Sequence, residues 1–155
     1  MKTDRSDDPA IPLATGVRAL IVAAPYYRAI TDQLLRGAEA AAAGATLDHV
    51  LVPGAFEIPA AIAHATRTGA YDGFIALGCV IRGETSHYDY VCGESARGLM
   101  DLSLQGHAIG YGVLTVDTME QAEVRADPAR GDKGGDATRA CLAMIALKQR
   151  FAKTR

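Results

Sequence analysis

Residues 75–91, IALGCVIRGETSHYDYV, contain the pattern that decides the fold of this chain. The segment begins with Ile75 to Ile81, a run of apolar and small residues without polar alternation. Such a run is typical of a strand that is buried on both faces of a parallel sheet. Arg82 to Ser86 is short and polar and contains a glycine, which predicts a loop. Ser86 and Asp89 have the spacing of a capping box, so we expect a helix to begin at Ser86.

The expected start of this helix has the chemistry of an active site. A helix N-terminus presents unpaired N–H groups and a partial positive charge, and together these attract anions. His87 falls in the first turn, and an imidazole can give and take a proton near neutral pH. On these residues alone, however, a surface histidine at an ordinary strand–loop–helix junction is the better explanation. The rest of the chain has to decide between the two.

The composition excludes several classes of protein. The chain has 155 residues, of which 49% are hydrophobic and 22% are charged, as in an ordinary globular domain. A net charge of −2 provides no basic excess for a nucleic-acid backbone. No apolar run approaches the roughly 20 residues that span a bilayer, and the first 16 residues lack the apolar core of a secretory signal. We therefore expect a cytoplasmic protein with neither a nucleic-acid nor a membrane partner.

The cysteines and histidines indicate no metal site. Cys79, Cys92 and Cys141 lie in apolar or helical segments and have no CxxC spacing. They are interpreted as reduced packing residues of a cytosolic protein. The four histidines are scattered, and no pair has the spacing of zinc ligands.

Apolar runs alternate with amphipathic segments along the whole chain. Strands are expected at residues 17–24, 46–52, 75–81 and 108–116. Helices are expected from about Ile30 with Thr31 as a candidate cap, from Pro59 to Gly69, from Ser86 to Gly106, from Thr118 with Gln121 as its capping box, and from Ala137 to Ala152. Residues 1–15 are expected to form a flexible tail and residues 16–155 a single domain. This order predicts an α/β three-layer sandwich, with a four-stranded, mainly parallel sheet flanked by helices on both faces.

Unusual residues follow each expected strand. Tyr26 and Tyr27 follow the first strand, Gly54 to Glu57 the second, and Arg82 to His87 the third, while the fourth leads towards Arg125. Because the carboxyl ends of parallel strands meet at one edge of a sheet, these residues are expected to converge there. A stacked heterocycle with a polar tail, together with a separate phosphate, would use all of them.

Three separated motifs resemble the lumazine synthase family. They are PGAFEIP at 53–59, IALGCVIRGETSHYDYV at 75–91 and GVLTVDTMEQA at 112–122, and the resemblance extends over about residues 17–152. It implies a flavodoxin-like fold. It also implies the condensation of 5-amino-6-(D-ribitylamino)uracil with 3,4-dihydroxy-2-butanone 4-phosphate, without cofactor or metal. The products are 6,7-dimethyl-8-ribityllumazine, phosphate and water, in the penultimate step of riboflavin biosynthesis.

The resemblance also implies roles for individual residues. Tyr26 would stack on the pyrimidine ring, Glu57 would accept hydrogen bonds from the ribityl hydroxyls, His87 would transfer protons, and Arg125 would bind phosphate. The remaining implied residues are Ala55 and Phe56 beside the ring and ribityl chain, Cys79, Val80 and Ile81 at the strand end, Glu84 and Thr85 at the phosphate, Tyr111 from a neighbouring subunit, and Lys133 nearby. We interpret Tyr27, Tyr88 and Tyr90 as packing residues.

The implied partners are the two small substrates and further copies of the chain. The family's active site lies between adjacent subunits of a pentamer, and riboflavin synthase is a candidate partner. Larger shells are associated with a glycine-rich kink, for which residues 127–132 here read DPARGD, and this departure favours a pentamer as the working unit. Pro25, where the family often has arginine, is a second departure, and it affects the loop before Tyr26. Two alternatives stay open: a flavin- or lumazine-binding module without turnover, and a purely structural cage protein.

Overall fold

The strand predicted from the apolar run lies inside the sheet. The computed structural model describes residues 9–154. Its strands are β1 (Arg18–Ala23), β2 (Thr46–Leu51), β3 (Gly73–Ile81) and β4 (Ala108–Val116). Its helices are α1 (Arg28–Ala40), the single 3₁₀ turn η1 (Ala55–Glu57), α2 (Ile58–Thr66), α3 (His87–Leu104), α4 (Met119–Ala126) and α5 (Lys133–Ala152).

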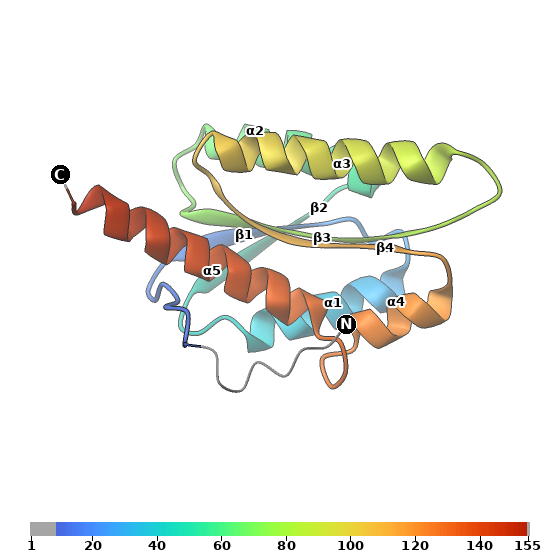
Figure 1. Cartoon of the computed structure of the whole chain (residues 1–155), viewed down its shortest axis with the longest axis horizontal. Coiled ribbons are helices and arrows are strands. Elements are labelled where there is room, and N and C mark those ends of the chain that lie inside the picture. Colours follow the sequence, from blue (N-terminus) through green and yellow to red (C-terminus); the bar gives the residue numbers. More distant parts are fainter. Residues whose placement is uncertain (1–8, 155) are drawn as a thin grey trace.

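The sheet is entirely parallel and has the order β2-β1-β3-β4. Figure 1 shows α2 and α3 on one face of the sheet and α1, α4 and α5 on the other. The predicted three-layer α/β sandwich is therefore confirmed. Since β3 pairs with β1 on one side and with β4 on the other, its carboxyl end is flanked by two neighbouring strand ends.

Two apolar cores hold the layers together, one on each face of the sheet. Successive side chains of a strand point to opposite faces. In β1, Ile21 and Ala23 belong to the core under α1 and α5, whereas Leu20 and Val22 belong to the core under α2 and α3. This double burial explains why β1 and β3 are nearly continuous apolar runs.

Glycines let α5 approach its neighbours closely. A Cβ on Gly110 of β4 would overlap the carbonyl oxygen of Ala137 in α5. Likewise, a Cβ on Gly134 would overlap the backbone of Leu34 in α1. The close packing of α5 on both elements therefore depends on the absence of side chains at these two positions.

One predicted helix start is wrong, and at a second helix the start at Ser86 is confirmed but the predicted capping bond is absent. Thr31 is not a cap, because α1 begins three residues earlier and the threonine is buried inside it. Ser86 has helical dihedral angles (φ −70°, ψ −1°) and makes no side-chain capping bond. The predicted cap at Thr118 is confirmed, since its hydroxyl accepts a hydrogen bond from the Gln121 N–H at 3.2 Å.

The start of the last helix and the N-terminal tail also differ from the expectation. Helix α5 begins at Lys133, four residues before the predicted Ala137, because the glycine-containing segment before Ala137 is helical. Of the expected tail, residues 1–8 lie outside the described residues. Residues 9–15 have no regular secondary structure, but Ala14 is buried and its N–H donates to the Leu142 carbonyl at 3.1 Å. Within residues 9–154, no helix is both long and apolar enough to cross a membrane.

Candidate active site

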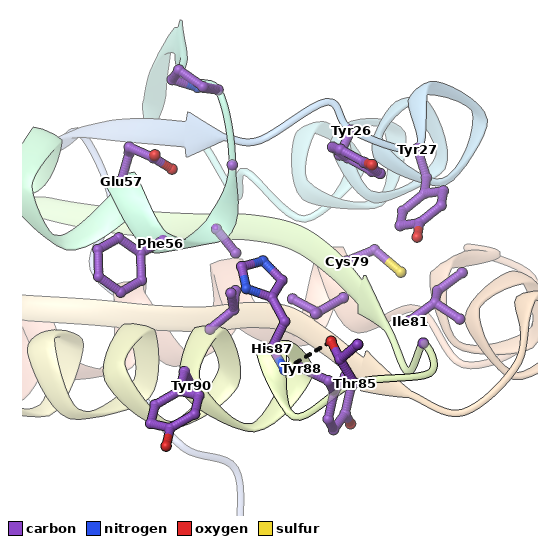
Figure 2. A pocket seen from close by; sticks show the side chains of 16 residues that line it. Tyr26, Tyr27, Phe56, Glu57, Cys79, Ile81, Thr85, His87, Tyr88 and Tyr90 are labelled. Atoms are coloured by element: carbon purple, nitrogen blue, oxygen red, sulfur yellow. Dashed lines mark hydrogen bonds between the residues drawn. The ribbon is translucent and has the colours of Figure 1, made fainter.

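A cleft of about 720 Å³ opens at the carboxyl ends of β1 and β3. Its walls come from the β1–α1 turn, the segment before α2, the end of β3 and the start of α3 (Figure 2). Nine of the predicted site residues line it: Tyr26, Ala55, Phe56, Glu57, Cys79, Val80, Ile81, Thr85 and His87. A cavity therefore lies at the carboxyl ends of the strands, where the site residues are predicted to converge.

Two tyrosines form the aromatic side of the cleft. Tyr26 is 74% exposed, and its ring meets the ring of Tyr27 edge-to-face, with 5.0 Å between the centroids. Thr31, in the first turn of α1, makes hydrogen bonds to the turn that carries them. The hydroxyl of Thr31 donates to the carbonyl oxygens of Ala24 at 3.3 Å and Tyr27 at 3.2 Å. An exposed ring on a fixed turn is a suitable platform for a planar ligand.

The segment before α2 supplies the opposite wall. Gly54 is extended (φ −154°, ψ 171°) and its carbonyl accepts the N–H of Glu57 at 3.1 Å, which closes the single turn η1. Ala55 is buried and packs near Gly78 of β3. Phe56 is 56% exposed, so it is a surface aromatic rather than a core residue. Glu57 lies beside it on the cleft side in Figure 2.

The end of β3 forms the floor. Cys79 is only 6% exposed, and burial, together with the nearby Cys92, raises the pKa of its thiol to about 11. The thiol is therefore protonated at neutral pH and contributes an apolar contact rather than a nucleophile. Val80 and Ile81 are half-buried next to it and complete the floor.

The turn between β3 and α3 brings the histidine into the cleft. Thr85 Oγ1 accepts the backbone N–H of His87 at 3.4 Å, so Thr85 takes the place that a capping side chain would have at this helix start. In Figure 2 the imidazole points into the space between Phe56 and Cys79. Glu84, in contrast, is exposed and is not among the cleft residues.

Arg82, the first residue after β3, contacts side chains on both sides of this turn. Its Nε lies 3.0 Å from Asp117 Oδ1, and its Nη1 lies 3.5 Å from Asp89 Oδ1. The guanidinium also lies 4.2 Å from the centre of the Tyr88 ring. The hydrogen bond to Asp117 and the nearby carboxylates hold the pKa of Arg82 above its ordinary value. Asp89, predicted as half of a capping box, is thus an ion-pair partner of Arg82.

Three predicted residues lie elsewhere. Tyr111, Arg125 and Lys133 line a second, smaller hollow of about 220 Å³ along β4, which is an edge strand of the sheet. Tyr111 is 46% exposed there. The Arg125 Nη1 donates to the Gln121 carbonyl at 3.1 Å, which aligns the guanidinium along α4. One chain therefore carries twelve of the thirteen predicted residues in two separate hollows, and Glu84 lines neither of them.

The interpretation of three tyrosines as packing residues is confirmed for Tyr27, which packs against the core under α1 and α5, but it is incomplete. Tyr27, Tyr88 and Tyr90 all line the cleft, and Tyr90 is 68% exposed. Tyr27 directly follows the predicted stacking residue, and Tyr88 and Tyr90 fall in the first helical turn with His87. Proximity in sequence to predicted site residues was the signal that could have identified them.

The cleft offers aromatic surfaces, a carboxylate, backbone groups and an imidazole, which suits a polar heterocycle. Within residues 9–154, no group of three or more His, Cys, Asp or Glu side chains is arranged to hold a metal ion. The three cysteines are free thiols.

Comparison with known proteins agrees with this chemistry. The family model for 6,7-dimethyl-8-ribityllumazine synthase matches residues 16–149. A protein of that name from Methylobacterium radiotolerans is 55% identical over 151 residues, covering 96% of this chain and 92% of the relative. The 6,7-dimethyl-8-ribityllumazine synthase 1 of Rhizobium meliloti is 58% identical over 143 residues, covering 87% of this chain and 94% of the relative. Another relative, from Novosphingobium aromaticivorans, is 53% identical over 135 residues, which is 86% of this chain.

Proposed function

This chain belongs to the 6,7-dimethyl-8-ribityllumazine synthase family, and we propose that its cleft, completed by a neighbouring subunit, is the active site. The protein is a transferase of riboflavin biosynthesis. It condenses 5-amino-6-(D-ribitylamino)uracil with 3,4-dihydroxy-2-butanone 4-phosphate, which gives 6,7-dimethyl-8-ribityllumazine and releases phosphate and water. The observation that carries the proposal is the meeting of nine predicted site residues in one cavity.

The cleft suits the pyrimidine substrate. In the proposed arrangement the pyrimidine ring lies on Tyr26, between the β1–α1 turn and the backbone of β3. The ribityl chain extends along the segment before α2, where the Glu57 carboxylate accepts hydrogen bonds from its hydroxyls. Exposure of Tyr26 and Phe56 supports this placement, since exposed aromatic side chains that line a cleft are free to contact a ligand.

The histidine and the turn before it suit the phosphate substrate. The reaction forms an imine between an aromatic amine and a ketone and eliminates phosphate, so protons must leave the amine and reach the departing oxygen atoms. His87 projects into the cleft, where an imidazole can transfer both kinds of proton. Thr85 and the first N–H groups of α3 provide hydrogen-bond donors for the phosphate, and Glu84 belongs to the same turn on the phosphate side.

Completion of the site requires a second copy of the chain. Arg125, Tyr111 and Lys133 lie at the open edge of β4 and not in the cleft of their own chain. In a ring of subunits, the β4 edge of one copy would supply Arg125 to the phosphate and Tyr111 to the pyrimidine in the cleft of the next. We propose a homopentamer built in this way, and we place it in the cytoplasm as a single domain of residues 16–155, with riboflavin synthase as a candidate partner.

Turnover and its dependence on Arg125 test the proposed site. Purified protein is mixed with both substrates, and lumazine formation is followed by absorbance against the spontaneous reaction. Arg125→Ala is expected to lower turnover, and the matched control is Arg130→Ala, which removes an arginine paired with Asp127 in the loop after α4. Equal activity of the Arg125→Ala variant and the wild type would contradict the phosphate role.

A mixing experiment tests the shared site. His87→Ala removes the cleft half and Arg125→Ala removes the donated half, so each variant alone has low activity. When the two are co-expressed in equal amounts, random assembly gives roughly a quarter of the clefts an intact His87 and an intact neighbouring Arg125. Activity near that fraction of the wild type supports a site between subunits. Activity no higher than the average of the two variants contradicts it.

A further inference from the structure

One arginine outside the predicted site connects three segments that surround the reacting groups. Arg82 continues the pairing of β3 with β4, because its N–H donates to the Val116 carbonyl at 2.9 Å. Its side chain then turns to Asp117 at the end of β4, to Asp89 in the first turn of α3, and to the ring of Tyr88. The β3 end, the α3 start and the β4 end are thereby tied to one guanidinium.

Each of these segments carries part of the proposed site. The turn after Arg82 contains Thr85, and the first turn of α3 contains His87. Asp117 lies between β4 and the N-cap of α4, Thr118, and its N–H donates to Gln121 Oε1 at 2.8 Å. Helix α4 in turn carries Arg125, whose guanidinium donates to the carbonyl of the same Gln121. Arg82 is therefore linked to Arg125 by a continuous series of contacts through Asp117 and Gln121.

We propose that Arg82 is a positioning residue for the phosphate-bearing substrate. It fixes the turn of Thr85 and the start of α3 against the Asp117 end of α4. We assign it no contact with the substrate, because its side chain is not among those that line the cleft and points instead to Asp89, Asp117 and Tyr88. This inference rests on the proposed function, because it assigns the phosphate to the turn that Arg82 holds.

The chemistry of the contact explains why this residue is an arginine. Single ion pairs at exposed positions contribute little to stability, and Arg82 is about half exposed. The planar guanidinium, however, reaches two carboxylates while it stacks on an aromatic ring, and these three contacts define one geometry. A lysine would keep the charge but would lose the simultaneous contacts. The main effect of Arg82 is therefore expected on the geometry of the turn and not on folding.

The test separates the two substrates kinetically. In Arg82→Gln, the KM for 3,4-dihydroxy-2-butanone 4-phosphate is expected to rise by roughly three- to tenfold, the effect of losing a small ion-pair network. Inhibition by inorganic phosphate should weaken by a similar factor. Binding of the product lumazine, measured by fluorescence, should stay unchanged, because Tyr26 and Phe56 do not depend on Arg82. Arg82→Lys should recover only part of the loss.

The chain offers a matched control in Arg97 of α3. This residue also has two ion pairs, with Glu94 at 2.7 Å and Asp101 at 3.1 Å, but it lies outside both hollows. Arg97→Gln should therefore have the kinetics of the wild type. Asp117→Asn should change the phosphate-substrate KM in the same direction as Arg82→Gln, and it carries the test if Arg82→Gln does not assemble.

The results distinguish this inference from the function on which it rests. A wild-type protein without turnover would contradict the proposed function, whatever the variants do. With an active wild type, the role of Arg82 is refuted if Arg82→Gln and Asp117→Asn behave like Arg97→Gln. It is also refuted if both variants weaken lumazine binding as much as phosphate binding. A non-additive effect in the Arg82→Gln/Asp117→Asn double variant supports it, because both single changes remove the same contact.

Discussion

Replacement of Thr31 by valine should weaken substrate binding through the turn that carries Tyr26. Thr31 is 1% exposed, and its hydroxyl donates to the carbonyl oxygens of Ala24 and Tyr27. The Tyr27 carbonyl keeps a second donor, the Thr31 N–H at 3.0 Å, but the contact with Ala24 is lost. Valine has nearly the same shape as threonine, so the change removes the hydroxyl and little else.

The expected loss of stability depends on the Ala24 carbonyl, because the Tyr27 carbonyl keeps a hydrogen-bond donor in the variant. A buried carbonyl that loses its partner costs about 1–3 kcal/mol, and the long 3.3 Å bond to Ala24 places the change near the lower end of that range. The free energy of unfolding should therefore fall by about 1–1.5 kcal/mol. Because stacking on an aromatic ring contributes about 0.5–1.5 kcal/mol, a displaced Tyr26 should weaken lumazine binding by roughly two- to tenfold.

Thr138 provides the matched control. It is also fully buried, and its hydroxyl donates to the Gly134 carbonyl at 3.0 Å, but it lies in α5 away from the cleft. Thr138→Val should lower stability by about 0.5–1 kcal/mol and leave lumazine affinity unchanged. Urea unfolding at a fixed protein concentration and a fluorescence titration with lumazine measure both quantities. If Thr31→Val loses stability but binds lumazine like Thr138→Val, then Thr31 does not position the aromatic turn.

Two further outcomes are expected for residues of the cleft. His87→Ala should assemble normally and lower turnover by roughly 10²-fold, because positioning of the substrates survives the loss of proton transfer; stopped-flow absorbance measures this, and full activity would contradict the role. Cys79 should resist iodoacetamide at pH 8, since a pKa of about 11 leaves a thiolate fraction of about 10⁻³ there, and the fraction rises about tenfold per pH unit up to that pKa. Peptide mapping should find Cys92, which is half-buried, modified before Cys79, and the reverse order would argue against a protonated, buried Cys79.

The inner strands β1 and β3 could be predicted closely because each is a nearly continuous apolar run, whereas the edge strand β2, TLDHVL, is largely exposed and has no such run. The fourth strand has the predicted bounds, and β3 begins only two residues before the predicted Ile75. Burial on both faces requires an unbroken apolar sequence, and only a few positions in the chain provide one. The parallel arrangement then follows from the alternation of strands and helices, because each helix returns the chain to the end of the sheet at which the previous strand began.

Helix starts were predicted less well, for a local physical reason. A hydroxyl near a helix start can accept a bond as a cap or donate one to a carbonyl of the preceding turn, and sequence spacing does not distinguish the two. Thr31 donates, and α1 begins at Arg28 without a side-chain cap. At α3, the hydroxyl that accepts is that of Thr85, one residue before the predicted Ser86.

Strand order alone predicts which residues converge at the carboxyl ends of the strands, but it does not predict the position of residues along the outer side of β4. The rule that ligands bind at carboxyl ends places Tyr26, Glu57 and His87 together, because each comes directly after a strand or at the start of the next helix. Tyr111 lies within β4, opposite Ala76 of β3, and therefore far from the carboxyl end. Its side chain lies at the outer edge of the sheet, which only the strand order reveals. A pattern that is local in sequence identifies what each strand end offers, but the separation of the second hollow from the cleft depends on β4 being an edge strand. That same position leaves the residues of the hollow open to another subunit.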